Sequence, residues 1–402
     1  MEMKQLPPAN LETWVLAGQS NMYGVGELAE ALPPDPRVWN FTSQGAWEIA
    51  REPLHWARES YTPVNIEMCR AGMTPEQKQT ITPEEMAEEE RRTRVTGAGL
   101  GLPFGTAMAD VVGSSIGLIA AAHGGASMAQ WSTAFKNQGG NSLYGAMFDR
   151  IARAGRQVRG LLWYQGESDT GPADSRAYPG LMMKWITQFR ADIGQPDLPV
   201  LLVQLGNCTL DGWFNEEGWN YVRHAQYALA EQLPHVAVTS AVDLGLDDVI
   251  HIDTAGQRRL GQRMARQALA MTGRANYSQG PRLARVERVP IRESREGIRL
   301  HFTGVTGAWQ PANPMGGFGV LNREGALHPE NHIFSARRDR IDPTAIYLRL
   351  NVPLQEGESL VYGHGLRPYC NVVDSADMPL CAFRWMATQN GGSLNGYPEI
   401  KG

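Results

Sequence analysis

The chain has 402 residues, 42% of them hydrophobic, and a net charge of −5. These values predict a globular protein of two or three domains with a sizeable core. The charge argues against a broad basic surface for nucleic acid, and since no run of about 18 apolar residues occurs, no membrane span is expected. The opening MEMKQLPPANLE lacks the apolar core of a signal peptide. The expectation leans toward the cytoplasm, with a periplasmic or secreted location left open for a trimmed chain.

Short apolar runs alternate with longer amphipathic segments up to about Gly273. The apolar runs are typical of buried parallel strands: Thr13–Ala17, Ile116–Ala122, Gly160–Tyr164, Val200–Leu205 and Val236–Val242. Helical patterns lie between them: Pro103–Val112, Leu143–Ala154, Tyr178–Ile193, Tyr221–Gln232 and Thr254–Met271. This alternation predicts a doubly wound α/β sheet that is covered on both faces.

Two regions depart from this alternation. A strongly charged segment that begins at Thr74 predicts a solvated helical insertion or lid, near residues 60–100. After Ala275 the sequence changes to short alternating runs such as Ile298–Phe302, Ala345–Leu350 and Ser359–Tyr362, which predict a small β-sandwich. The predicted domains are therefore 1–275 and 276–402. Cys370 and Cys381 lie close in sequence, and either a disulfide or two free thiols fits them.

The first strand runs directly into Gly18-Gln19-Ser20-Asn21. In open α/β sheets ligands bind at the carboxyl ends of the strands, so a serine at this corner lies at the site-forming edge. Gly18 permits a tight turn there. Ser20 is a candidate nucleophile, although a helix N-cap is an equally good interpretation of GQS by itself.

Asp248-Val249-Ile250-His251 follows the last predicted strand and precedes the last helix. A histidine in this place can take the proton from Ser20, while Asp248 fixes its tautomer and stabilises the imidazolium. By itself a DxxH pattern is weak, because an aspartate beside a surface histidine is common.

Two further loops follow predicted strands. In His123-Gly124-Gly125-Ala126-Ser127 the paired glycines let a backbone N–H approach a ligand, as an oxyanion donor must. In Gln165-Gly166-Glu167-Ser168 the Gln165 amide can donate to a developing oxyanion. Each loop alone is also an ordinary strand–helix turn. Together, the four loops supply the residue types that acyl transfer requires.

In this order, GQSNM, GGAS with Trp131, QGE and DxxH resemble the blocks of the SGNH-type hydrolases. More narrowly they resemble the sialate O-acetylesterase and acetylxylan esterase branch of carbohydrate esterases, from about Trp14 to Ala270. The segment LVYGHGLRPYCNVVDSADMPLCAFR, from Leu360, is similar to the closing segment of bacterial sialate O-acetylesterases. The resemblance implies a flavodoxin-like three-layer α/β/α fold with a parallel sheet, followed here by a small all-β domain.

The resemblance also implies roles for single residues. Ser20 matches the nucleophile, His251 the general base and Asp248 its partner. The backbone N–H groups of Ser20, Gly124 and Gly125, with the Gln165 side chain, match the oxyanion hole; other SGNH enzymes carry Asn where this branch has Gln165. Many members of the branch carry a further β-domain before or inside the hydrolase, whereas this chain begins almost directly at the GQSNM strand.

Several residues near these blocks keep more than one interpretation. Glu167 either orients His251, in place of Asp248 or together with it, or binds backbone amides of its own turn. Arg223 and Gln226 belong to a segment that resembles a helix of the family, and a structural role is favoured for both. His123 is either a buried, hydrogen-bonded histidine or a substrate contact.

The sequence therefore predicts a serine esterase that removes O-acetyl groups from carbohydrates through an acetyl-enzyme. No cofactor is expected, and no cluster of His, Cys and carboxylates shows metal-ligand spacing. The expected partner is an acetylated sugar (a sialate, xylan or another glycan), and neither the sugar nor the oligomeric state can be derived. Two alternatives remain: an esterase or thioesterase for longer acyl chains, and an inactive carbohydrate-binding protein.

Overall fold

The computed structural model describes residues 6–155, 157–210, 212–274, 276–291, 296–328 and 332–388. The chain packs into two compact units. Unit 1 comprises Met1–Asp169, Leu181–Leu201 and Gly245–Leu269, and unit 2 comprises Thr170–Gly180, Leu202–Leu244 and Ala270–Gly402. Unit 2 thus takes two segments from the α/β part of the sequence, and the predicted boundary at 275/276 remains a prediction.

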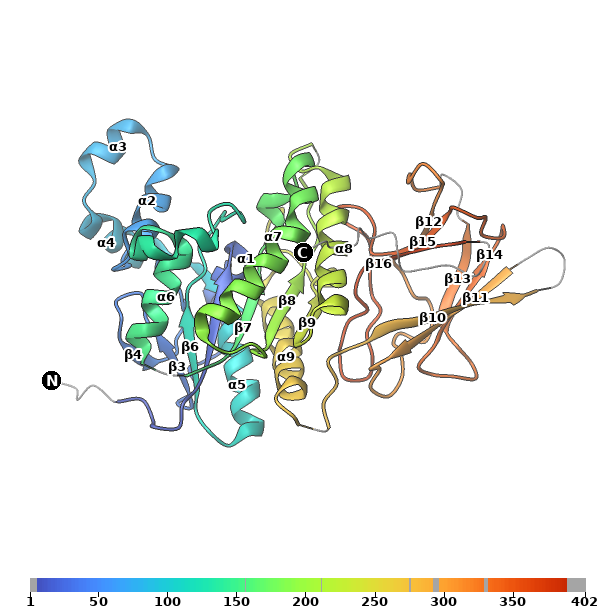
Figure 1. The fold of residues 1–402 in the computed structure, drawn as a ribbon, viewed down its shortest axis with the longest axis horizontal. Coiled ribbons are helices and arrows are strands. Elements are labelled where there is room, and N and C mark those ends of the chain that lie inside the picture. The colour runs from blue at the N-terminus through green and yellow to red at the C-terminus, as the bar shows by residue number, and fades with distance from the viewer. Residues whose placement is uncertain are drawn as a thin grey trace. The chain divides into compact units, whose positions relative to one another are not determined.

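A seven-stranded sheet has the order β4-β3-β6-β1-β7-β8-β9 (Figure 1). Its strands are β1 (Glu12–Gly18), β3 (Val38–Phe41), β4 (Trp47–Ile49), β6 (Ile116–Ala120), β7 (Val158–Tyr164), β8 (Val200–Gln204) and β9 (Val236–Ser240). β1 pairs in parallel with both β6 and β7, while β4 runs antiparallel to β3. All five predicted strands are present, and β3 and β4 are additional.

Helices alternate with these strands. They are α1 (Ser20–Tyr23), α5 (Gly101–Val112), α6 (Leu143–Ala154), α7 (Pro172–Ile193), α8 (Glu216–Gln232) and α9 (Thr254–Met271). α5 packs closely on the sheet because it carries glycine at the contact: a Cβ at Gly101 would lie 2.7 Å from the Leu16 side chain and 2.6 Å from Leu54. The predicted α/β class with a large, mostly parallel sheet is confirmed.

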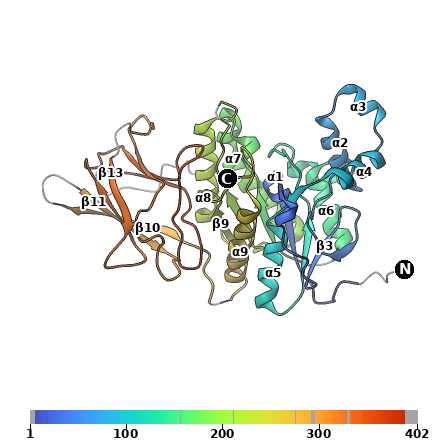
Figure 2. The same cartoon turned by 180° about the vertical axis from the view of Figure 1, so that it is seen from behind.

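The charged segment that begins at Thr74 is helical, as predicted, and forms α3 (Pro75–Thr80) and α4 (Pro83–Thr93). A further helix, α2 (Pro63–Ala71), precedes it, and the three helices lie together at one end of unit 1 (Figure 2). Thr74 and Thr82 each begin a helix with a complete capping box, in which the side chain accepts the N–H of the third helical residue. We refer to α2–α4 as the charged insertion. A short antiparallel pair flanks it, β2 (Gly26–Glu27) and β5 (Thr96–Ala98).

The C-terminal part of unit 2 contains two antiparallel sheets, in the orders β10-β11-β14-β13 and β12-β15-β16. The strands are β10 (Arg282–Pro290), β11 (Glu296–Thr303), β12 (Phe318–Leu321), β13 (Ile333–Arg338), β14 (Ile346–Leu350), β15 (Ser359–Tyr362) and β16 (Phe383–Met386). Side chains from both sheets, among them Leu348 and Tyr362, share one hydrophobic core with Trp309. The predicted all-β texture of this region is confirmed.

Buried polar groups explain why unit 2 includes α8. The Arg223 guanidinium is fully buried and donates to the carbonyl oxygens of Leu205 and Gly363, both at 3.0 Å. Gln226 accepts the N–H of Leu205 at 3.0 Å. Both side chains therefore satisfy backbone groups inside unit 2, in agreement with the structural role favoured from the sequence.

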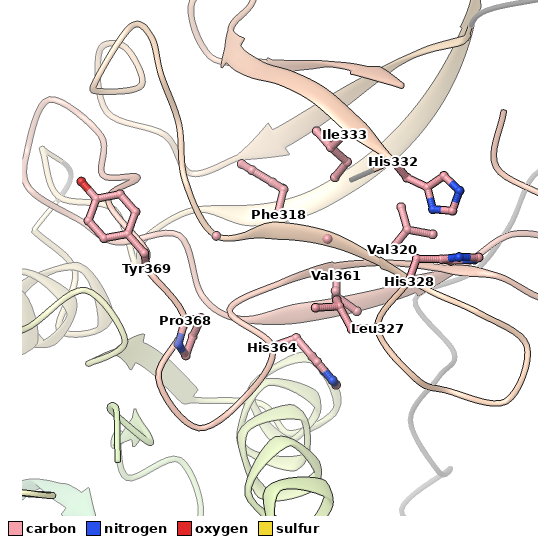
Figure 3. A pocket seen from close by; sticks show the side chains of 12 residues that line it. Phe318, Val320, Leu327, His328, His332, Ile333, Val361, His364, Pro368 and Tyr369 are labelled. Atoms are coloured by element: carbon pink, nitrogen blue, oxygen red, sulfur yellow. The ribbon is translucent and has the colours of Figure 1, made fainter. Parts of the chain in front are cut away.

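Beside β12 and β15 lies a cavity of about 400 Å³. Figure 3 shows its apolar side chains, including Phe318 and Val361, together with three imidazoles. The rings of His328 and His332 meet edge to face, 3.9 Å between centroids, and His328 Nε2 lies 3.0 Å from the Glu358 carboxylate.

All four cysteines lie in the described residues and are free thiols, so Cys370 and Cys381 are not joined.

His55 in unit 1 gives the protein a pH-dependent stability. Burial, together with the charges of Arg150 and Arg94, lowers the pKa of His55 to about 3. An unfolded histidine titrates near pH 6.5, so the unfolded chain binds this proton first as the pH falls. The free energy of unfolding is therefore unaffected by this proton above pH ~7, and it falls progressively as the pH is lowered from about pH 6.5 to pH 3. At pH 5 the loss due to His55 should be about 2 kcal/mol.

Urea unfolding of the wild type and of His55→Gln at pH 7 and pH 5 measures this effect. The free energy of unfolding of His55→Gln should fall about 2 kcal/mol less than that of the wild type between the two pH values. His235→Gln, at an exposed histidine, is the matched control and should retain the wild-type pH dependence. An unchanged pH dependence in His55→Gln would contradict the assignment.

Candidate active site

Ser20 lies immediately beyond the carboxyl end of β1. Gly18, the last residue of β1, has a φ of +137°, and a Cβ there would lie 2.1 Å from the Tyr164 carbonyl oxygen. Only glycine allows β1 to run this close to β7 and then turn. The N–H of Gln19 donates to the same Tyr164 oxygen at 2.8 Å, and α1 begins at the next residue, Ser20. The serine is thereby placed at the edge of the sheet where sites form.

A continuous hydrogen-bond chain joins three of the predicted residues. His251 Nε2 lies 2.9 Å from Ser20 Oγ, and His251 Nδ1 lies 2.7 Å from the Asp248 carboxylate. The other Asp248 oxygen accepts the backbone N–H groups of Ile250 and His251, each at 2.8 Å. The aspartate thus holds both the imidazole and the backbone of the loop that carries it. These contacts join loops that are 231 residues apart in the sequence.

The carboxylate of Asp248 is kept ionised. Its partial burial acts to raise its pKa, but the hydrogen bonds from His251 and from the two backbone N–H groups outweigh this effect and hold the pKa below its usual value. An ionised acceptor at Nδ1 favours the tautomer in which the proton is on Nδ1 and Nε2 is free to accept from Ser20.

Asn21 joins the loop of Ser20 to two other site loops, a role that the sequence analysis missed. Its amide nitrogen donates to Glu167 Oε1 at 2.8 Å and to the Ile250 carbonyl at 3.3 Å, and its oxygen accepts the N–H of Ile252 at 3.0 Å. Asn21 is 1% exposed, so these bonds form away from water. Its place within GQSNM, directly after the nucleophile, was the available signal.

Glu167 is therefore bonded to Asn21, and the bond from His251 Nδ1 goes to Asp248. Burial raises the pKa of the Glu167 carboxyl, and the hydrogen bond from Asn21 opposes this effect. An acid in this place helps to fix the amide of Asn21 and, through it, the backbone on either side of His251.

The remaining two loops are tied to the first by polar contacts. Gln19 Oε1 accepts the N–H groups of Gly166 and Ser168, at 3.4 and 3.3 Å. Ser168 Oγ donates to the Gly125 carbonyl at 3.1 Å. The four strand-end loops predicted to form the site are thus linked to one another, which fixes their relative positions.

Three backbone N–H groups are available as anion donors. Within the described ranges no hydrogen-bond acceptor takes the N–H of Ser20, Gly124 or Gly125. A Cβ at Gly124 or Gly125 would meet no atom within 4 Å, so the surroundings of this loop are open. These features fit an oxyanion hole, in which donors face a developing negative charge.

The side-chain amide of Gln165, which was predicted to donate to the oxyanion, already donates to other groups of the protein. Its side chain is fully buried, and its amide nitrogen donates to the Ala126 carbonyl at 3.1 Å and to the Asp169 carboxylate. Asp169 in turn accepts the N–H of Met128. An oxyanion role would require the amide to release one of these bonds, so the assignment of Gln165 to the oxyanion hole remains a prediction.

His123 is buried, and its burial lowers the pKa of the imidazole, which is therefore neutral near pH 7. Its Nδ1 lies 3.0 Å from the Gly124 carbonyl. Of the two interpretations of His123, the geometry matches a buried, hydrogen-bonded histidine that supports the glycine loop.

In the part of the chain that the structure describes, no three His, Cys, Asp or Glu residues are grouped so that they could bind a metal ion. Over the same residues, no helix combines the length and the hydrophobicity that crossing a bilayer requires.

Comparison with known proteins gives one family and two informative relatives. Residues 10–270 match the model of the family described as "Carbohydrate esterase, sialic acid-specific acetylesterase". A probable carbohydrate esterase of Arabidopsis thaliana is 27% identical over 288 residues, which are 66% of this chain and 92% of that protein. The crystal structure of a carbohydrate acetylesterase from Xanthomonas citri is 22% identical, covers 93% of this chain and 80% of its own, and has a TM-score of 0.63, which shows a shared fold. The chain therefore belongs to the carbohydrate esterase family of sialic acid-specific acetylesterases and is a carboxylic ester hydrolase.

Proposed function

We propose that the protein hydrolyses O-acetyl esters on carbohydrates with Ser20 as nucleophile, His251 as general base and Asp248 as its partner. The observation that carries the proposal is the unbroken chain of hydrogen bonds, 2.7 and 2.9 Å long, from the Asp248 carboxylate through His251 to Ser20 Oγ. Because the chain belongs to a family of carbohydrate acetylesterases, we expect the acyl group of the substrate to be acetyl and the alcohol to be a sugar.

In the first half of the reaction His251 Nε2 takes the proton from Ser20 Oγ as the oxygen attacks the acetyl carbonyl. The negative charge that develops on the carbonyl oxygen is stabilised by the backbone N–H groups of Ser20 and of the glycine loop. His251 then donates its proton to the departing sugar oxygen, which leaves the acetyl group on Ser20. In the second half a water molecule gives a proton to His251 and attacks the acetyl-enzyme. His251 then returns this proton to Ser20 Oγ as the bond to the acetyl carbon breaks, so that acetic acid leaves and the serine is restored.

Acetate release from three classes of substrate tests the proposal and identifies the sugar: O-acetylated sialic acid, acetylated xylan and simple acetylated monosaccharides. A series of p-nitrophenyl esters from acetyl to octanoyl tests the acyl group in parallel. The expected result is release of acetate from at least one acetylated sugar and a kcat/KM that is highest for acetyl. A maximum at longer chains would instead support the longer-chain esterase. Absence of both turnover and labelling of Ser20 by a serine-directed organophosphate would support an inactive binding protein.

A further inference from the structure

The charged insertion is fixed to the catalytic loops by buried polar contacts. Most of its residues are exposed, as its composition of Glu, Lys and Arg requires. Several residues are half-buried, and four are buried: Asn65 in α2 and Met86, Ala87 and Glu90 in α4. Both α2 and α4 contact residues that flank the proposed site, α2 through the backbone carbonyl of Asn65 and α4 through the side chain of Glu90.

The contact of α4 is with the helix that carries Ser20. Tyr23, the last residue of α1, donates its hydroxyl to Glu90 Oε1 at 3.3 Å. The other Glu90 oxygen accepts the N–H of Arg58 at 3.1 Å, and the Tyr23 hydroxyl accepts the N–H of Ala57 at 3.1 Å. One carboxylate of the insertion is thereby joined to the four-residue helix that begins at the nucleophile.

Arg94 completes this cluster. Its guanidinium lies 3.3 Å from Glu90 Oε1 and 3.2 Å from the Tyr23 hydroxyl, and it also donates to the carbonyl oxygens of His55 and Thr96. The Arg94 and Glu90 side chains are each only 10% exposed. At this burial the two charges depend on each other, because the loss of one would leave the other without a partner in a medium of low dielectric constant. The pair therefore differs from an exposed ion pair, which contributes little.

The contact of α2 is with the glycine loop. His123 Nε2 lies 3.3 Å from the Asn65 carbonyl and 3.8 Å from the Cys69 thiol. His123 is the residue before Gly124, and its Nδ1 faces the Gly124 carbonyl. A neutral imidazole has one N–H, so His123 donates either from Nε2 to the Asn65 carbonyl or from Nδ1 to the Gly124 carbonyl, and in the second case the Cys69 S–H can donate to Nε2. The insertion thus contacts two of the four site loops through two separate helices.

We propose that the charged insertion is a fixed support of two active-site loops, and that Glu90, Arg94 and Tyr23 are positioning residues that hold Ser20 in line with His251. This inference rests on the proposed role of Ser20. It distinguishes the insertion from a lid, because a lid must release its contacts in each catalytic cycle, and release here would separate the largely buried ion pair of Glu90 and Arg94 from the Tyr23 hydroxyl.

The proposal predicts a specific loss of turnover when the cluster is weakened. Glu90→Gln keeps the size of the side chain but removes the charge that pairs with Arg94, and Tyr23→Phe removes the hydroxyl that joins α1 to the cluster. For both variants kcat for p-nitrophenyl acetate should fall about 10-fold to 100-fold, because small misplacements of a reacting group cost this much. KM should change less than kcat, since these residues are proposed to act through the position of Ser20. Arg94→Lys, which retains the charge but not the planar fork, should show an intermediate loss.

The matched control is Glu89→Gln, one position away on the same helix, where the carboxylate forms an exposed pair with Arg58. It should retain wild-type kcat. Titration of active sites with an organophosphate, run to completion, gives the concentration of sites with a reactive Ser20, and circular dichroism gives the folded fraction. With kcat expressed per titrated site, a mere loss of stability does not count. If kcat per titrated site is unchanged in both Glu90→Gln and Tyr23→Phe, the positioning role is overturned.

Amide hydrogen exchange decides the same question without an enzyme assay. In Glu90→Gln the hydrogen-bonded amides of Met22, Tyr23 and Gly24 should exchange faster than in the wild type and in Glu89→Gln, because α1 has lost its anchor. Unchanged exchange there would also overturn the proposal. A wild-type protein that neither hydrolyses acetyl esters nor reacts at Ser20 would instead refute the proposed function, and the exchange data would still decide whether the insertion holds α1.

Discussion

Ser20→Ala should lower kcat for p-nitrophenyl acetate by a factor of about 10⁴ or more, with the fold unchanged. The loss should be this large because no acetyl-enzyme can form, and only binding and the oxyanion donors remain to accelerate the reaction. The substitution removes one hydroxyl from a half-buried position, so the circular dichroism spectrum and the thermal unfolding midpoint should stay close to those of the wild type.

A second serine at the opposite end of the strands serves as the control. Ser114 precedes β6, and its hydroxyl donates to Glu12, the first residue of β1. Ser114→Ala removes a comparable group far from the carboxyl ends of the strands and should leave kcat unchanged. A Ser20→Ala protein that retains even one tenth of the wild-type kcat would eliminate Ser20 as the nucleophile.

Asp248→Asn should lower kcat/KM for the same ester by a factor of about 10³ or more, whereas Glu167→Gln should lower it less than about tenfold. The asparagine amide can present N–H to Nδ1, which favours the tautomer that cannot accept the proton of Ser20. Glu167→Gln retains an oxygen that can accept the bond from Asn21, and it does not alter the 2.7 Å contact between His251 and Asp248. Steady-state kinetics of the two variants, measured side by side over pH 5 to 9, compares the two acids directly.

The opposite order of the two losses would make Glu167 the main partner of the histidine. Near-wild-type rates in both variants would contradict the whole Asp248–His251–Ser20 assignment. Asp248→Ala is a useful addition, because it removes the acceptor for the N–H groups of Ile250 and His251 as well. It should therefore be at least as impaired as Asp248→Asn.

The sequence was most informative where function and topology coincide. Ser20, Asp248 and His251 were predicted because they follow strands, and the parallel order of β1, β6 and β7 brings strand ends to one edge of the sheet. The helices Leu143–Ala154 and Thr254–Met271 were predicted with the bounds that the structure has, because their apolar periodicity is strong. β3 and β4 were missed because they are short, and their apolar residues resemble an irregular segment.

Long-range side-chain partners could not be derived in the same way. The bond between Tyr23 and Glu90 spans 67 residues, and the bond between Asn21 and Glu167 spans 146. Glu90 lies in a run of glutamates, and nothing in that run distinguishes the one that becomes buried. For Gln165 the residue type indicated a donor, but only the packing shows that Ala126 and Asp169 already accept from its amide.

The two kinds of glycine around the site impose different constraints on directed evolution. Position 18 cannot vary, since any added methyl group would collide with the Tyr164 carbonyl at 2.1 Å and force two neighbouring strands apart. Gly124 has an ordinary backbone φ and empty space where a methyl group would be, so an alanine fits there and still offers its N–H. A mutagenesis library that seeks altered acyl selectivity should therefore diversify residue 124 and leave residue 18 untouched.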